Sequence, residues 1–391
     1  MINKIEQTRR RLQAKGKKII NLSSGNPNEW GIFFKNKKVE AALEAFISGA
    51  VAYHPEAFGS GAARRSLQQY YSKKIGNITF ENIALTSGSS ESYFHLFRIL
   101  ASADGEILLP KPGYPLFEEI ARLNGTKISY YDLDEKNGWQ IDEKKLEKQI
   151  TPKTRAIVIV TPNNPTGTVL NKKSLQTVLQ VAEKNKLSII SDEVFSEYFF
   201  GKGKFPHIAG QKSTGKKSHV PIFTLNGISK TYAMPGFKLG WILMNNVRHE
   251  IKEELERSLD ALLATNQITQ TLLPVILKTG DSFIKQTTKR IQQNRVVMKN
   301  IFGKEKNLTY RDCEGGFYTF VKIDGMPFDD ETFTIKCMEQ TGIFVHPGYF
   351  YDYENGLYIV ISLLPIPEDF RKYLTKIKNF IQAHTQQHKG K

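Results

Sequence analysis

The chain is poor in cysteine and has no long apolar stretch. Only Cys313 and Cys337 occur among its 391 residues. Two cysteines are too few for a disulfide framework, so we expect reduced thiols in a cytoplasmic protein. No stretch reaches the roughly 18 apolar residues of a membrane-spanning helix. The polar start, MINKIEQTRRRLQAKGKK, lacks the apolar core of a signal peptide. We therefore predict no membrane partner.

Acidic residues are also few relative to basic ones. Lys and Arg number 55 against 39 Asp and Glu, which gives a net charge of +16. The lysines are scattered, except for a dense cluster within residues 201–219, whose Gly and Ser content predicts a solvated loop. No motif combines aromatic and basic residues as nucleic-acid-binding modules do, so we predict no nucleic-acid partner. A solvated basic surface is favoured over a binding surface, and an attraction for anionic substrates stays open.

What the chain does have is a regular alternation of short apolar runs and amphipathic helical patterns. Helices are predicted over residues 91–101, 116–124 and 172–185. Alternation of this kind is typical of an α/β fold, here a mostly parallel seven-stranded sheet with helices on both faces. The predicted strands are 82–86, 106–110, 127–133, 155–160, 187–191, 221–225 and 240–244.

The pattern changes in the last third of the chain. Residues 266–302 predict one long helical region, and strands are predicted over 316–323 and 357–364. We therefore expect a large domain over residues 34–285. A smaller α+β domain is expected to combine the N-terminal segment, residues 1–33, with residues 286–391.

Three polar residues each follow a predicted strand of this sheet. They are Asn164 in TPNNPTG, Asp192 in IISDEVF and Lys230 in NGISKTYAMPGFKLGW. In such sheets, ligands bind beyond the carboxyl ends of the strands. An amine, a carboxylate and a carboxamide at this place suit the aromatic aldehyde pyridoxal 5′-phosphate (PLP). Its aldehyde forms a Schiff base with a lysine, its pyridine nitrogen needs an acid, and its ring oxygen needs a donor. The trio therefore predicts an enzyme.

A turn rich in Ser and Gly, SGSS at residues 87–90, lies between a predicted strand and a predicted helix. Backbone N–H groups at a helix N-terminus form a ready phosphate site. Most turns of this composition only cap the helix. Because Lys230 and Asp192 occur in the same chain, the phosphate interpretation is favoured here.

The other candidate residues also have plain structural explanations. Asp192 could cap a helix or form an ion pair, and Asn164 could serve only a tight turn. Tyr114, in PKPGYP, is either core packing or a ring stacked on a cofactor. These alternatives stay open on the residues alone.

The order and spacing of NNPTG, SDEVF and SKTYAMPGFKLG resemble those of class I/II, aspartate aminotransferase-like enzymes, which are PLP-dependent and of fold type I. The resemblance includes GKKIINLSSGNP (16–27), YHPEAFGSGAARRSL (53–67) and HPGYF (346–350), and it covers most of the chain. It implies the PLP-dependent transferase fold type I and pyridoxal 5′-phosphate as cofactor. It also implies a homodimer with shared active sites, acting on a small amino donor and a keto or aldehyde acceptor.

The resemblance implies a role for individual residues. Lys230 forms the Schiff base and moves the proton, Asp192 pairs with the pyridine nitrogen, and Asn164 hydrogen-bonds the ring oxygen. Tyr114 stacks on the ring, and Tyr53 reaches the phosphate bound by the partner subunit. The cofactor-binding set is completed by Gly88, Ser89, Ser90, Ser229 and Lys238.

Three departures from the family pattern affect the cofactor site. The family has an arginine eight residues after the lysine, whereas this chain has Lys238, a point charge without the bidentate fork. Phe195 replaces a tyrosine that donates to the ring oxygen, which predicts a raised pKa for the imine formed by Lys230. Gly227 replaces a serine, which removes one phosphate hydroxyl.

A fourth departure affects the substrate. The family carries an arginine two residues before a serine in the last strand, and this arginine binds the substrate α-carboxylate. Alignment on Ser362 places Val360 there, and no arginine lies between Arg311 and Arg371, which falls in a predicted helix. Either another cation binds the carboxylate, or the substrate has none. We favour the second alternative, which would suit an amine, an amino alcohol, an amino aldehyde or a group on a larger molecule.

An aminotransferase is the favoured function. A PLP-dependent lyase, decarboxylase or condensing enzyme on the same fold is the alternative, because the same residues would hold the cofactor. A non-catalytic PLP-binding regulator is a remote alternative, since the chain has no spare segment for a DNA-binding domain. The aromatic segment 346–358 is expected either to line the substrate pocket or simply to pack.

Overall fold

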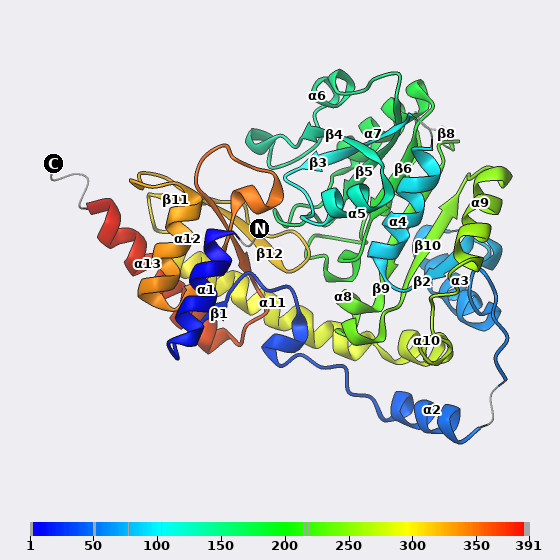
Figure 1. Ribbon diagram of the computed structural model, residues 1–391, viewed down its shortest axis with the longest axis horizontal. Helices are drawn as coiled ribbons and strands as arrows, with labels where there is room; N and C mark the ends of the chain where they lie inside the picture. Colours follow the sequence, from blue (N-terminus) through cyan, green and yellow to red (C-terminus); the bar gives the residue numbers. More distant parts are fainter. Residues whose placement is uncertain are drawn as a thin grey trace.

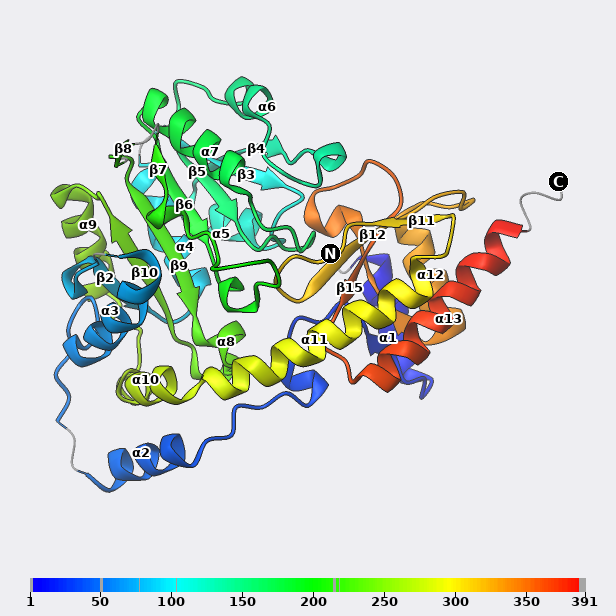
Figure 2. The same cartoon turned by 180° about the vertical axis from the view of Figure 1, so that it is seen from behind.

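The computed structural model describes residues 3–49, 52–76, 78–102, 104–213, 216–217 and 219–386. Two groups of elements are visible in Figures 1 and 2, one around a large twisted sheet and one formed mainly by the last third of the chain. The helix α11 (Asp281–Phe302) runs from one group to the other (Figure 1).

A seven-stranded sheet forms the large group, with the strand order β2-β10-β9-β6-β5-β3-β4. β10 is antiparallel to both of its neighbours, and the other pairs are parallel. The predicted α/β fold is confirmed, and each predicted strand is present with ends that differ by a residue or two. The strands are β2 (Ile83–Thr86), β3 (Glu106–Lys111), β4 (Lys127–Asp132), β5 (Thr154–Val160), β6 (Ser188–Asp192), β9 (Ile222–Gly227) and β10 (Gly240–Asn245).

Both faces of this sheet are buried, which explains the near-continuous apolar strands. Successive side chains of β3 enter different clusters: Ile107 and Leu109 pack on one face, and Leu108 packs on the other. The first face is covered by α4 (Ser89–Leu100), α5 (Phe117–Asn124) and α9 (His249–Asp260), and the second by α6 (Glu143–Lys148) and α7 (Lys172–Asn185) (Figures 1 and 2). At the β2–β10 edge lie α3 (Gly61–Ile75) and α10 (Gln267–Thr279), and α2 (Lys37–Ser48) packs on α10.

The single helical region predicted over residues 266–302 is interrupted. Two helices, α10 and α11, meet at Gly280. A Cβ on Gly280 would lie 2.1 Å from the ring of Tyr232, so a larger residue could not pack there. The apolar pattern continues across the break because both helices bury one face, and this continuity hid the interruption from the sequence.

The second group contains a four-stranded antiparallel sheet with the order β11-β12-β15-β14. Its strands are β11 (Leu308–Tyr310), β12 (Tyr318–Ile323), β14 (His346–Pro347) and β15 (Tyr358–Ser362), of which β11 and β14 were not predicted. Its helices are α12 (Asp330–Thr341) and α13 (Pro367–Gln386), joined by α1 (Lys4–Ala14) from the start of the chain. β1 (Ile20–Asn21) pairs in parallel with β13 (Ile343–Phe344), so the N-terminal segment lies against this group.

The basic segment 201–219 contains more regular structure than predicted. β7 (Lys212–Ser213) and β8 (Lys216–Lys217) form a short antiparallel pair where only a loop was expected. Lys202 and Lys204 are exposed, as a solvated loop requires, and residues 214, 215 and 218 lie outside the described residues. Among the described helices, none combines the length and apolar character needed to cross a membrane.

Candidate active site

Lys230 lies in the short helix α8 (Ile228–Thr231), directly after β9. The lysine side chain is half-buried, and its Nζ donates a 2.9 Å hydrogen bond to the main-chain oxygen of Gly25. Burial lowers the Lys230 pKa to about 8, although the negative charges of Asp192 and Glu29 act in the opposite direction. An amine with this pKa is partly neutral near neutral pH, so it can act as a nucleophile and as a base.

Asp192 is the last residue of β6 and is only 6% exposed. Its Oδ1 accepts a 3.0 Å bond from the Val194 N–H, and its Oδ2 accepts a 2.8 Å bond from the Tyr93 hydroxyl. Burial raises the Asp192 pKa to about 6, and both hydrogen bonds act against that shift. Tyr93 is a site residue that the sequence did not reveal, because an aromatic residue on a helix predicts only core packing.

Asn164 follows β5 and is 9% exposed. The turn around it is held by its neighbour Asn163, whose Oδ1 accepts from the N–H and the hydroxyl of Thr166. The amide oxygen of Asn164 is buried without a hydrogen-bond partner in the described part of the chain. A buried acceptor of this kind normally has a partner, so a donor on a ligand can bind it, and the amide nitrogen of the same side chain is the group that can donate to a ligand oxygen.

A cavity of about 100 Å³ brings these groups together. Six of the site residues predicted from the sequence line it: Ser89, Tyr114, Asn164, Asp192, Ser229 and Lys230. Tyr318, which the sequence did not indicate, lines it from β12. The remaining lining residues are Val160, Val194, Phe195, Gly227 and Leu239. Lys230 is therefore the one cationic side chain among the described lining residues.

The predicted phosphate turn lies at the N-terminus of α4. Gly88 has a φ of 105°, a conformation that favours glycine, and α4 begins at the next residue. Gly240 packs closely against this turn, since a Cβ on Gly240 would lie 3.0 Å from the Ser89 nitrogen. A Cβ added to Gly88 would lie 3.9 Å from the Nζ of Lys238. A cation and a helix N-terminus thus face the same small space.

Tyr114 lies at the wall of the cavity, beside the acid. Its ring contacts Phe117 edge-on, with 5.5 Å between the ring centres. Burial raises the Tyr114 pKa, and the charge of Asp192 raises it further, while a hydrogen bond with Ser90 lowers it. Tyr114 is therefore a neutral phenol close to both Asp192 and the phosphate turn.

These features fit pyridoxal 5′-phosphate. A buried acid, an amine of lowered pKa, an unsatisfied amide and an anion-binding helix end surround one cavity. Each matches one functional group of that molecule: the pyridine nitrogen, the aldehyde, the ring oxygen and the phosphate.

Comparison with known proteins identifies the family of this chain. A sequence model of the family described as Aminotransferase class I and II matches residues 17–366. The chain is 28% identical over 379 residues to the tyrosine aminotransferase of Mus musculus, and the match covers 94% of this chain and 82% of that protein. It is 28% identical over 387 residues to the glutamate-pyruvate aminotransferase AlaA of Haemophilus influenzae, covering 96% and 94%.

Solved structures agree in fold. An aminotransferase from Escherichia coli matches with a TM-score of 0.88 at 26% identity, over 98% of this chain and 95% of that one. The alanine aminotransferase from Pyrococcus furiosus matches with a TM-score of 0.90 at 24% identity, over 97% and 96%. The chain belongs to the aminotransferase class I and II family. It is therefore an aminotransferase of fold type I that uses pyridoxal 5′-phosphate, as predicted.

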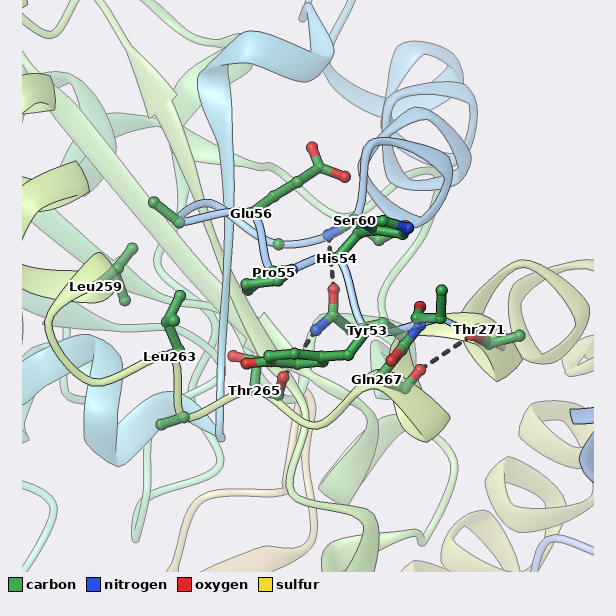
Figure 3. A pocket seen from close by; sticks show the side chains of 15 residues that line it. Tyr53, His54, Pro55, Glu56, Ser60, Leu259, Leu263, Thr265, Gln267 and Thr271 are labelled. Atoms are coloured by element: carbon green, nitrogen blue, oxygen red, sulfur yellow. Dashed lines mark hydrogen bonds between the residues drawn. The ribbon is translucent and has the colours of Figure 1, made fainter. Parts of the chain in front are cut away.

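Tyr53 lies away from the cavity of this aminotransferase. It is 66% exposed and lines a larger pocket of about 350 Å³ that contains none of Lys230, Asp192 and Asn164. Figure 3 shows Tyr53 with Pro55 and Thr265 in this pocket. The Ser60 N–H donates a hydrogen bond to Oε1 of Gln270, another lining residue. The smaller of these two pockets is therefore the one that holds Lys230, Asp192 and Asn164.

Two of the departures from the family pattern have clear structural settings. Phe195 is buried against Phe317, with 4.9 Å between ring centres, so an apolar ring takes the place of a hydroxyl donor. A Cβ on Gly227 would lie 2.8 Å from the Leu239 oxygen and 3.1 Å from the Gly240 Cα. Backbone atoms cannot turn away, so a serine at this position would require the backbone to shift.

Val360 lies fully buried in β15, between Phe320 of β12 and His346 of β14. Arg371 is exposed on α13 and does not line the cavity. The aromatic segment 346–358 contacts the Tyr114 loop, because the Gly113 N–H donates a 3.1 Å bond to the Tyr351 oxygen.

Proposed function

We propose that this aminotransferase acts on a substrate without a carboxylate beside the reacting carbon. The single observation that carries this proposal is the absence of an arginine, or of any cation except Lys230, among the described residues that line the cavity. A buried carboxylate without a cationic partner would be strongly disfavoured.

The sheet face beside the cavity supports the same conclusion. Directly opposed residues on neighbouring strands share a face, so His346, Val360 and Phe320 project to one side. Tyr318, two residues before Phe320, projects to that side as well and lines the cavity. Burial lowers the His346 pKa to about 4, so this imidazole is neutral at pH 7. The face thus offers neutral hydroxyl and imidazole groups where a carboxylate would need a cation.

The roles that we propose for the cofactor residues follow from their positions. Bound pyridoxal 5′-phosphate supplies an electron-withdrawing ring that stabilises negative charge on the substrate carbon. Asp192 would hold the pyridine nitrogen, Asn164 the ring oxygen and Tyr114 the ring. Lys230 would hold the aldehyde, and its amine, once freed by the amino donor, would accept the proton that leaves the substrate carbon. The phosphate is held by Gly88, Ser89, Ser90, Ser229 and Lys238.

A second candidate is an ordinary amino-acid aminotransferase, which the names of the tyrosine and glutamate-pyruvate aminotransferases favour. In that case a cation outside the described cavity lining would bind the carboxylate. The alternative PLP-dependent lyase, decarboxylase or condensing reaction has no comparable support.

The test adds L-glutamate, L-alanine and an aromatic amino acid, and then simple amines and amino alcohols, to the cofactor-loaded enzyme. We expect amines to discharge the absorption band of the lysine-linked cofactor and amino acids to leave it unchanged at comparable concentrations. Discharge by amino acids would establish the second candidate and refute the first.

We also propose a homodimer in which Tyr53 completes the partner's phosphate site. Support comes from two exposed apolar side chains that a second copy would cover: Leu263, which lines the larger pocket with Tyr53, and Leu262, its neighbour in the chain. Hybrid dimers test the arrangement. Tyr53→Ala and Lys230→Met copies, when mixed, should form one intact site per hybrid and regain activity. Without regained activity in confirmed hybrids, Tyr53 does not act across the interface.

The domain division is a further proposal: a large domain over residues 34–285, and a small one of residues 1–33 and 286–391. The β1–β13 pairing supports the assignment of the N-terminal segment to the small domain. Limited proteolysis tests this division.

We also propose a cytoplasmic location, because Cys313 and Cys337 are free and buried. Cell fractionation tests this location.

A further inference from the structure

Asp192 is surrounded by groups with opposing effects on its charge. The Tyr93 hydroxyl and the Val194 N–H donate to its two oxygens, and the Lys230 ammonium attracts its negative charge. Burial and the neighbouring Glu193 favour the neutral acid, and the Tyr114 ring lies nearby. Of these groups, only Tyr93 donates a side-chain hydrogen bond to Asp192 in the described structure.

The Tyr93 hydroxyl is held rigidly. The residue is fully buried, and its ring contacts Phe97 and Phe117 edge-on, at 5.6 Å and 5.1 Å between centres. Tyr93 lies one turn into α4, the helix whose first residue, Ser89, adjoins the phosphate turn. One rigid helix therefore fixes both the proposed phosphate site and the donor to the acid.

We propose that Tyr93 is a positioning residue that keeps Asp192 ionised, so that the proton of the acid–pyridine pair stays on the cofactor nitrogen. The proposal rests on the proposed role of Asp192. Without the Tyr93 donor, the carboxylate becomes more basic. The N–H bond of the pyridinium then breaks, an O–H bond forms on Asp192, and a buried ion pair becomes a neutral pair. The ring withdraws fewer electrons in the neutral pair.

This role gains importance from Phe195. The ring oxygen has one donor fewer than the family pattern provides, because Phe195 has no hydroxyl. The ability of the ring to withdraw electrons then depends more heavily on protonation of its nitrogen, on which Tyr93 acts through Asp192.

The test compares Tyr93→Phe with the matched control Tyr131→Phe. Tyr131 is also fully buried, and its hydroxyl donates a 2.8 Å bond to the Val158 oxygen in the strand interior. Both variants lose one buried hydroxyl, but only Tyr93→Phe affects Asp192. The readout is the ¹⁵N chemical shift of the pyridine nitrogen in enzyme loaded with ¹⁵N-labelled cofactor, together with kcat and KM.

For Tyr93→Phe we expect the ratio of protonated to unprotonated nitrogen to fall by roughly tenfold, since a hydrogen bond to a charged group is lost. kcat should fall while KM changes little. Tyr131→Phe should retain the wild-type chemical shift. Equal shifts in wild type and both variants would overturn the proposal.

Site-specific replacement of Tyr93 by ortho-fluorotyrosine gives a second test that preserves the packing, should Tyr93→Phe fold poorly. Its more acidic hydroxyl is a stronger donor, so the protonated fraction should rise, and an unchanged or lower fraction would overturn the proposal. Failure of the proposed role of Asp192 is seen separately, since the pyridine nitrogen of the wild-type enzyme would then be unprotonated.

Discussion

The amine of Lys230 is hydrogen-bonded to the main-chain oxygen of Gly25, 205 residues earlier in the chain. Gly25 is also covered by Tyr318, because a Cβ on Gly25 would lie 1.6 Å from the Tyr318 hydroxyl oxygen. Three distant segments therefore meet at one glycine: the N-terminal segment, the helix after β9 and strand β12. The catalytic amine is positioned by both groups of elements.

Replacement of Gly25 should disturb the contact between these three segments. Gly25→Ala inserts a methyl group into the space of the Tyr318 hydroxyl, so Tyr318 must move into the cavity or the segments must separate. We expect the free energy of unfolding to fall by about 1–3 kcal/mol and kcat/KM to fall more than tenfold. Urea unfolding and steady-state kinetics measure the two effects. Gly236→Ala, where a Cβ meets nothing within 4 Å and the backbone φ is not positive, as at Gly25, is the control for the intrinsic cost of replacing a glycine.

Lys230→Met should abolish turnover and stabilise the cofactor-free protein. The folded-state pKa of about 8 lies below the ordinary value of 10.5, so the unfolded chain binds more protons between these values. The free energy of unfolding of the wild type therefore rises with pH across this window. Below pH 8, Lys230→Met should be more stable than the wild type by roughly 1–3 kcal/mol.

The pH dependence separates this effect from loss of the bond to Gly25. The advantage of Lys230→Met should shrink as the pH rises from 8 toward 10.5, and chemical denaturation at several pH values measures it. An advantage independent of pH would show that Lys230 is not a buried, destabilised cation. Residual turnover above background would contradict its catalytic role.

Lys238 should contribute to retention of the cofactor phosphate. Lys238→Gln keeps a polar, unbranched side chain that is one atom shorter and removes the charge that faces the Gly88 turn, so we expect affinity for pyridoxal 5′-phosphate to fall by roughly tenfold or more. Lys238→Arg restores a bidentate fork and should bind at least as tightly as the wild type. Titration of the cofactor-free protein measures both, and equal affinity in all three proteins would remove Lys238 from the phosphate site.

Gly227→Ser should fail to restore the phosphate-binding hydroxyl that the serine of the family pattern provides. The new Cβ would meet the Leu239 oxygen at 2.8 Å and the Gly240 Cα at 3.1 Å. Since both contacts are with backbone, we expect a loss of about 1–3 kcal/mol in unfolding free energy and weaker cofactor binding. Thermal unfolding and cofactor titration test this. A stable variant with tighter cofactor binding would show that β9 and β10 can separate here.

Phe195→Tyr should restore a donor to the ring oxygen. A hydroxyl that stabilises the phenolate form of the cofactor weakens the hold on the imine proton, so the pH midpoint of the absorption change of the loaded enzyme should fall by about one unit. Absorption titration of wild type and variant measures the shift. Phe317→Tyr, at the neighbouring ring, is the control, and an equal shift in both would indicate a general effect of polarity.

Much of the fold could be predicted because its strands are buried on both faces. Apolar runs such as residues 155–160 and 187–191 have no polar alternation that would permit another assignment. The interruption at Gly280 could not be predicted, because it depends on the ring of Tyr232, 48 residues earlier in numbering, and not on local pattern. Strands as short as β14 carry too few residues for a periodic pattern.

The sequence by itself determined the chemistry of the site. Lys230, Asp192 and Asn164 each follow a strand of a parallel sheet, and such strands end at a common edge, so local pattern was enough to bring them together. Only the tertiary structure decided which further groups act on them. Tyr93 bonds Asp192, Gly25 bonds Lys230 and Tyr318 closes the cavity, each across a long stretch of chain. Such contacts are set by the packing of distant segments, and no local periodicity of the sequence records them.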